Sequence, residues 1–80
     1  FSILKDTEGY IWSATENGLV RYDASNVTLY AGKALHAEPR DRPVARIVFE
    51  DASKNLFTLT SKGKILQYDR LKDKFTVVND

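Results

Sequence analysis

Residues 9–23 read GYIWSATENGLVRYD, and the pattern in this stretch decides the fold. Side chains alternate around a single tryptophan, an Asn-Gly pair follows, and a second short run ends in Tyr-Asp. Alternation with a period of two is typical of a β-strand, and Asn-Gly between two such runs predicts a hairpin. If this hairpin is one unit of a repeat, an imperfect copy must lie elsewhere in the chain.

Residues 54–69, KNLFTLTSKGKILQYD, are that copy. The aligned pairs are Asp6 and Asp51, Ile11 and Leu56, Trp12 and Phe57, Thr15 and Thr60, Gly18 and Gly63 and, after one extra residue in the second copy, Tyr22-Asp23 and Tyr68-Asp69. Ile3 falls near Val48, and VTLY (27–30) falls on FTVV (75–78). The offset grows from 45 to 46 residues at the insertion. Periods in the mid-forties are typical of repeat arrays and propellers.

Turn signals divide each copy into four short strands. The predicted strands are 2–5, 10–15, 19–22 and 27–30, then 46–50, 55–60, 64–68 and 74–78. DTEG (6–9) suits a type I turn, whereas ENG (16–18) and SKG (61–63) suit hairpins. No helix is predicted. Residues 31–45 hold both prolines and are predicted to cross from one copy to the next, with Leu35 and Val44 able to anchor them to the core.

Composition excludes several classes of function. A net charge of +1 argues against nucleic acid as an obligate partner, because such binding neutralises many phosphates. Without cysteine the chain has no disulfide, thiolate or cysteine metal site. No apolar run approaches the ~20 residues of a membrane span, and no signal peptide is visible. The chain starts at Phe1 and lacks methionine, so we expect it to be part of a longer protein.

The pattern at 6–23 closely resembles the two-component regulator propeller repeat. The usual form of that repeat is an Asp, a Gly, then Ile-Trp-x-Gly-Thr, a short turn, Gly-Leu and a Tyr-Asp pair. The matching residues are Asp6, Gly9, Ile11, Trp12, Thr15, Gly18, Leu19, Tyr22 and Asp23. Ala14 replaces a glycine of the repeat. In the second copy Phe57 replaces the tryptophan, Leu59 the strand glycine and Lys54 the turn glycine.

The resemblance implies an all-β fold of two four-stranded antiparallel blades packed face to face, a fragment of a propeller that usually has seven blades. Blade 1 would span 1–30, a crossover loop 31–45 and blade 2 46–80. Such repeats are similar to the periplasmic sensor half of hybrid two-component receptors, common in gut Bacteroidetes, which bind oligosaccharides and signal to a cytoplasmic histidine kinase. The implied partners are further blades of the parent chain, an oligosaccharide and a second receptor copy in a homodimer.

Ligands of propellers gather on the face made by the beginnings of first strands and by the turns between second and third strands. This topology nominates Glu16, Asn17, Arg40, Asp41, Arg42, Ser61 and Lys62. Arg40 or Arg42 of the predicted crossover loop 31–45 could bind a carboxylate or sulfate through two hydrogen bonds. The alternative is an ordinary solvated loop.

Other conspicuous residues are interpreted more simply. Trp12 could stack on a sugar, but Phe57 recurs at its position, which favours packing between blades, with an acceptor for the indole N–H. His36 has no partner at a metal-ligand spacing and is predicted to be a surface residue. The recurring aspartates, Asp6 with Asp51 and Asp23 with Asp69, are predicted to bind local backbone amides rather than to act as paired catalytic carboxylates.

The leading hypothesis is therefore a ligand-sensing propeller fragment without catalytic residues, metal or cofactor. The alternative is a protein-interaction propeller without a small ligand, and a propeller enzyme is a third class that lacks supporting residues. We predict no contact of this segment with nucleic acid or membrane. Two blades cannot close a ring, so apolar outer faces would stay open. The isolated chain is therefore expected to self-associate or exchange strands.

Overall fold

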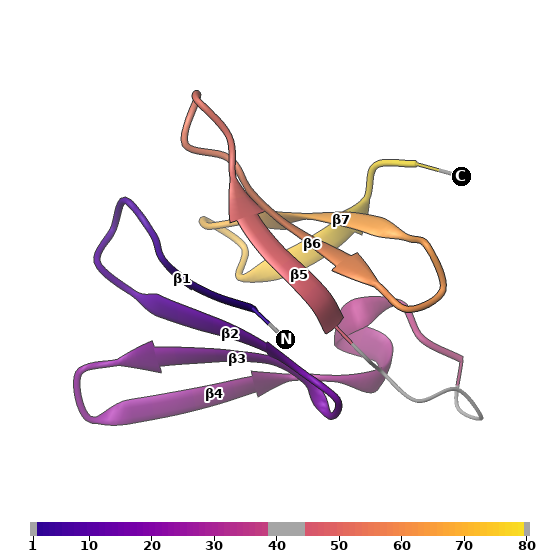
Figure 1. Ribbon diagram of the computed structural model, residues 1–80, viewed down its shortest axis with the longest axis horizontal. Coiled ribbons are helices and arrows are strands. Elements are labelled where there is room, and N and C mark those ends of the chain that lie inside the picture. The colour runs from indigo at the N-terminus through magenta and orange to yellow at the C-terminus, as the bar shows by residue number, and fades with distance from the viewer. Residues whose placement is uncertain (1, 39–44, 80) are drawn as a thin grey trace.

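The computed structural model of the chain describes residues 2–38 and 45–79 and shows an all-β fold. Two four-stranded antiparallel sheets follow each other along the sequence, each with its strands in chain order (Figure 1). The first sheet contains β1 (Ser2–Lys5), β2 (Ile11–Thr15), β3 (Gly18–Asp23) and β4 (Asn26–Tyr30). The second contains β5 (Ala45–Glu50), β6 (Leu56–Thr60), β7 (Ile65–Asp69) and β8 (Lys74–Val77). The predicted strands are thus confirmed, each boundary within one residue.

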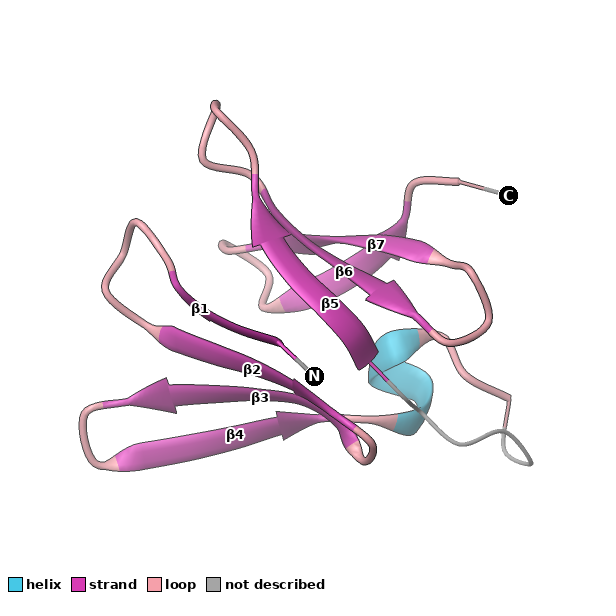
Figure 2. Cartoon of the chain, viewed as in Figure 1, coloured by secondary structure: helices cyan, strands magenta, loops and turns pink. Residues whose placement is uncertain are grey.

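The link between the sheets departs from the prediction of a loop without helix. It begins with one turn of 3-10 helix, η1 (Gly32–Leu35), which is the only helical element in the described residues (Figure 2). Leu35 is buried, as predicted, and fixes this turn to the core, whereas Val44 lies outside the described residues. A single turn of this kind has no 3.6-residue periodicity, so the sequence pattern does not reveal it.

The two aspartate turns share one backbone design. Gly9 N–H donates to the Asp6 carbonyl at 3.0 Å, and Lys54 N–H donates to the Asp51 carbonyl at the same distance. The fourth residue of each turn has a positive φ, 92° at Gly9 and 69° at Lys54. This region favours glycine, so the second copy holds a lysine in a strained position.

The hairpin at ENG places its loop one residue earlier than the Asn-Gly signal suggests. Glu16 and Asn17 form the loop, and Gly18 already pairs with Thr15 in the β2–β3 ladder. Gly18 has a φ of 129°, and a Cβ there would collide with the Tyr30 carbonyl oxygen. The glycine is therefore needed for the close approach of the chain at the end of β4.

The sheets pack against each other through aromatic side chains. Trp12 is completely buried, stacks on Tyr30 at 5.6 Å, and meets the edges of Tyr68 at 5.0 Å and Phe75 at 6.2 Å from the second sheet. Strand β5 lies beside β1 and β2. The prediction that Trp12 fills the space between the two sheets is confirmed, and each offset or edge-to-face ring pair adds about 0.5–1.5 kcal/mol beyond area burial.

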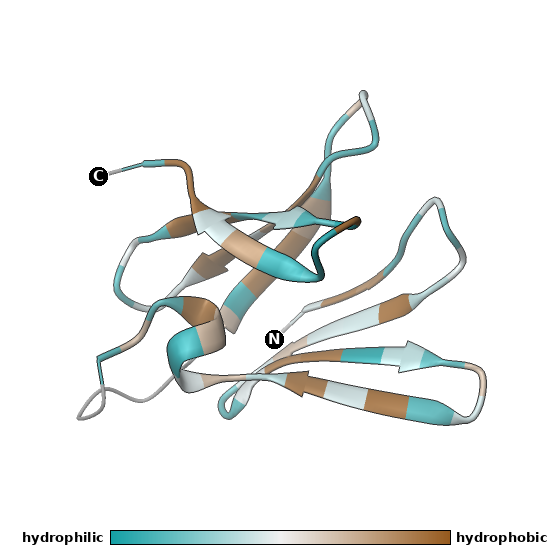
Figure 3. Cartoon of the chain, turned by 180° about the vertical axis from the view of Figure 1, so that it is seen from behind, coloured by the Kyte–Doolittle hydropathy of each residue, from teal (hydrophilic) through white to brown (hydrophobic). Residues whose placement is uncertain are grey.

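The two copies use opposite faces for this packing. Side chains alternate along each strand, as the hydropathy colours along β4 illustrate (Figure 3). In β2, Trp12 and Ala14 point toward the second sheet and are buried. In β6 the inward residues are Leu56, Thr58 and Thr60, so the aligned partners of Trp12 and Ala14 point away from the first sheet. The repeat is therefore stacked front to back.

Candidate functional site

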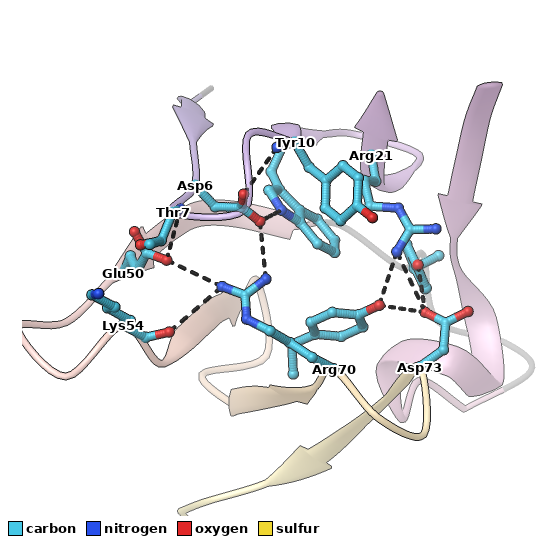
Figure 4. A network of polar contacts seen from close by, with 11 residues as sticks. Asp6, Thr7, Tyr10, Arg21, Glu50, Lys54, Arg70 and Asp73 are labelled. Atoms are coloured by element: carbon cyan, nitrogen blue, oxygen red, sulfur yellow. Dashed lines mark hydrogen bonds and ion pairs between the residues drawn. The ribbon is translucent and has the colours of Figure 1, made fainter. Parts of the chain in front are cut away.

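A network of polar side chains crosses the boundary between the sheets (Figure 4). It contains two arginines, one from each sheet, and each reaches acceptors on the opposite sheet. Aromatic rings separate the two arginines. The network contains ion pairs from both sheets, which makes it a candidate functional site.

Arg70, in the turn after β7, forms the first half of the network. Its Nη1 lies 3.1 Å from Asp6 Oδ2 and its Nη2 lies 3.1 Å from Glu50 Oε2. The same Asp6 oxygen accepts the Trp12 indole N–H at 2.7 Å, which confirms the predicted acceptor. Burial raises the pKa of the Asp6 carboxyl, but the hydrogen bonds from Trp12, Arg70 and the Tyr10 amide outweigh burial and hold this pKa below its usual value.

Arg21, in β3, forms the second half. Its Nη1 donates to Tyr68 Oη at 2.9 Å and lies 3.8 Å from Asp73 Oδ1. That carboxylate oxygen also accepts the hydroxyl groups of Tyr30 at 2.7 Å and Tyr68 at 2.6 Å. The guanidinium carbon lies 5.0 Å from the centre of the Tyr10 ring, within the range of a cation–π contact. Buried Arg21 Nε finds no hydrogen-bond partner among the described residues.

The protonation states in this half suit binding rather than proton transfer. Hydrogen bonds from Tyr30 and Tyr68 lower the pKa of Asp73, so its carboxylate is charged at neutral pH. Burial, followed by donation to Asp73, raises the pKa of Tyr30, and burial likewise raises that of Tyr68. Both hydroxyls therefore stay protonated as donors. This arrangement joins the sheets and supplies no activated nucleophile.

Two hollows flank the network, and both are near the lower limit of small-molecule sites. One, of about 370 Å³, lies between η1 and the start of β8 and is lined by Tyr30, Lys33, Ala34, His36, Asp73, Lys74 and Phe75. The other, of about 360 Å³, is lined by Lys54, Asn55, Leu56, Gln67, Tyr68, Asp69, Arg70 and Thr76. The first is mainly apolar and the second mainly polar.

The predicted ligand-binding residues lie elsewhere. Glu16 and Asn17 form the exposed β2–β3 turn, and Ser61 and Lys62 lie in the exposed β6–β7 turn. Both turns are on the right-hand side of Figure 1, the side on which η1 lies. None of these four residues lines either hollow. Arg40, Asp41 and Arg42 are outside the described residues, so the grouping as a whole stays a prediction.

The recurring aspartates bind local amides at three of the four positions. Asp6 Oδ1 accepts the Tyr10 amide, Asp51 Oδ1 accepts those of Ser53 and Asn55, and Asp69 Oδ1 accepts those of Leu71 and Lys72. The interpretation as turn residues is confirmed for these three. Asp6 differs from the others because it also accepts the Trp12 indole N–H within the first sheet and Arg70 from across the sheet boundary.

His36 is exposed, as predicted, but it is not merely solvated. Its Nε2 lies 2.6 Å from the Phe75 carbonyl oxygen, and its own carbonyl accepts Lys64 Nζ at 2.6 Å. It thus ties the end of η1 to the second sheet. Within the described ranges, no three histidine, cysteine or acidic side chains lie together as a metal site would need.

The network residues Arg21, Tyr30, Arg70 and Asp73 were not predicted from the sequence. A usable signal was present, because the charges do not recur: Arg21 aligns with Gln67, and Arg70 aligns with Ala24. A charge that appears in only one copy of a repeat has a role that is not part of the shared fold. Here the role is at the boundary between the copies.

Comparison of the chain with protein-family models, curated proteins and solved structures found no match. In the part of the chain that the structure describes, no helix has the length and apolar character needed to cross a bilayer.

Proposed function

We propose that the chain forms two consecutive blades of a β-propeller, and that this propeller is the extracytoplasmic sensor of a hybrid two-component receptor that binds an oligosaccharide. The observation that carries the proposal is the front-to-back stacking of the two copies. Trp12 and Ala14 face the second sheet, whereas their equivalents Phe57 and Leu59 face away from the first. An arrangement in which each copy covers the one before it is the one that a ring of blades requires.

The route of the chain also supports consecutive blades. The chain leaves the last strand of the first sheet, passes through η1, and returns to β5, which lies beside β1 and β2 (Figure 1). A ring with a central axis needs such a return from the outermost strand to the innermost strand of the next blade. The buried anchor Leu35 stabilises this return.

The ligand would bind at the end of the sheets where the β2–β3 and β6–β7 turns lie. Loops on a rigid scaffold are common positions for binding residues. Glu16, Asn17, Ser61 and Lys62 offer donors and acceptors for sugar hydroxyls there. Binding energy that differs between two arrangements of a receptor dimer would transmit the signal.

The decisive experiment on this proposal is the sequence of the parent gene on both sides of Phe1 and Asp80. We expect further copies of the unit, then a membrane helix and a histidine-kinase domain. If the copies end without a membrane helix or kinase, the signalling role is wrong and a protein-interaction propeller becomes the better interpretation.

Calorimetry of the intact ectodomain with a panel of glycans then tests the binding residues. Replacing Asn17 or Ser61 by alanine should weaken binding about five-fold each, because one lost hydrogen bond costs about 1 kcal/mol. The matched control is Ser53→Ala in the β5–β6 turn at the opposite end, which should leave the affinity unchanged. Equal effects of all three substitutions would contradict the proposed binding end.

A further inference from the structure

The outer face of each sheet carries large apolar side chains open to solvent. On the first sheet these are Ile3, Ile11, Tyr22, Val27 and Leu29, with 72% of Ile3 and 66% of Val27 exposed. On the second sheet Ile47 and Phe49 are exposed, and Phe49 stacks on Phe57 at 5.3 Å. Open apolar faces of this kind mark surfaces that other proteins cover.

The open face of the first sheet is the repeat equivalent of a face that is already covered. Ile11 aligns with Leu56, Tyr22 with Tyr68 and Val27 with Phe75. All three of these partners are buried against the first sheet. The outer face of the first sheet is therefore similar to the inner face of the second sheet, which packs against the first sheet.

The open face of the second sheet shows the converse relation. Its residues Phe57 and Leu59 align with Trp12 and Ala14, and Trp12 packs on Tyr68 and Phe75 in the contact between the sheets. One chain thus has two open faces of complementary kind, and the structure already contains the packed form of that pair.

We propose that the outer face of the second sheet is a docking surface for the outer face of the first sheet of a second copy of this chain. In this contact Val27 and Tyr22 of one copy would pack on Phe57 of the other, as Phe75 and Tyr68 pack on Trp12. The two surfaces differ, so the contact is heterologous and leaves one open face at each end. Such contacts continue into rings or open chains.

The contact between copies is weaker than the contact within the chain because the polar network is absent from it. Ala24 occupies the position of Arg70, Gln67 that of Arg21, and Phe57 has no indole N–H to donate. The docking surface is therefore apolar. The extent of association between copies depends on protein concentration. This docking depends on the repeat and on the two open faces of the 80-residue chain, and not on the proposed sensor role.

Sedimentation velocity of the 80-residue chain over a concentration series is the first test. The mass should rise from 9.1 kDa to more than twice this value, since every copy has both faces. A mass that stays at 9.1 kDa up to about 1 mM would overturn the proposal.

Mixing two variants tests which faces meet. Val27→Glu blocks the outer face of the first sheet, and Phe49→Glu blocks that of the second. Each variant alone should sediment as a single chain, while an equimolar mixture should form a one-to-one dimer through the two intact faces. Dimers of either variant alone, or no dimer in the mixture, would contradict docking between unlike faces and favour pairing of like faces or exchange of strands.

Controls separate loss of docking from loss of folding. Leu71 is 99% exposed in the β7–β8 turn and lies outside both faces, so Leu71→Glu should associate as the wild type does. The emission of buried Trp12 reports whether each variant keeps the packed sheets. If Val27→Glu or Phe49→Glu does not fold, the mixing experiment is repeated with Ile3→Glu for the outer face of the first sheet and Ile47→Glu for that of the second.

Discussion

The turn before Trp12 and the turn before Phe57 have the same backbone but different surroundings. Both begin with an aspartate that binds the amide four residues later, at 2.9 Å from Asp6 and 2.8 Å from Asp51. Asp6 is buried and also accepts hydrogen bonds from the side chains of Trp12 and Arg70, whereas Asp51 is exposed. The comparison separates what one copy specifies by itself from what it gains when the next copy covers it.

Local sequence specifies the turn, the strand pairs and the alternation of side chains in both copies. Covering by a neighbour buries the tryptophan and, among the described residues, adds a charged network at the boundary between the copies. Substitutions at matched positions in the two copies share the local contribution to stability, so the difference between them measures the contribution of the neighbouring copy.

The largest difference is expected between Trp12→Ala and Phe57→Ala. Trp12 is completely buried between the sheets, so its removal should lower the free energy of unfolding by about 3–5 kcal/mol. Phe57 is only partly buried, so Phe57→Ala should lower the free energy of unfolding much less. Urea unfolding followed by far-ultraviolet circular dichroism measures both, and equal losses would contradict the front-to-back stacking.

Replacing the paired aspartates should give the next largest difference. Asp6→Ala leaves the Trp12 indole N–H and Arg70 Nη1 without their acceptor at a buried position, which should cost about 3 kcal/mol. Asp51→Ala removes only exposed bonds within its turn and should cost less. Arg70→Met removes the other partner of the Asp6–Arg70 ion pair. If it lowers the free energy of unfolding no more than Asp51→Ala does, this ion pair adds no stability.

Acid should weaken the boundary between the sheets. The folded-state pKa values of Asp6 and Asp73 lie below the ordinary value of about 3.9, so both carboxylates stabilise the folded chain fully above that pH. This stabilisation is lost as the pH falls through the lowered values, because protonation then favours the unfolded chain. Asp6→Asn should flatten the fall in stability below about pH 4, measured by urea unfolding at each pH.

The smallest change is expected at the fourth turn residue. Lys54→Gly relieves a lysine at a φ of 69° and should raise the free energy of unfolding by about 0.5–1 kcal/mol. Gly9→Ala, at a φ of 92°, should lower it by a similar amount. Thermal unfolding of both variants checks the signs. A loss of stability in Lys54→Gly would mean that the contact of Arg70 with the Lys54 carbonyl depends on the lysine.

Sequence was sufficient for the features that one copy determines. Turn residues and alternation located all eight strands, and the recurrence of an aromatic residue at 12 and 57 identified Trp12 as a packing residue. It was not sufficient for η1, which is a single turn held by its buried Leu35. The network was missed for a related reason, since Arg21 and Arg70 find their partners only across the boundary between the sheets.

The most direct test of the front-to-back arrangement compares a tryptophan at position 12 with one at position 57. Acrylamide quenching of the wild type is compared with that of the Trp12→Phe/Phe57→Trp double variant at low micromolar concentration, which limits association between copies. The arrangement predicts a shielded Trp12 with blue-shifted emission and an accessible tryptophan at position 57. Equal quenching at the two positions, or stronger quenching of Trp12, would contradict it.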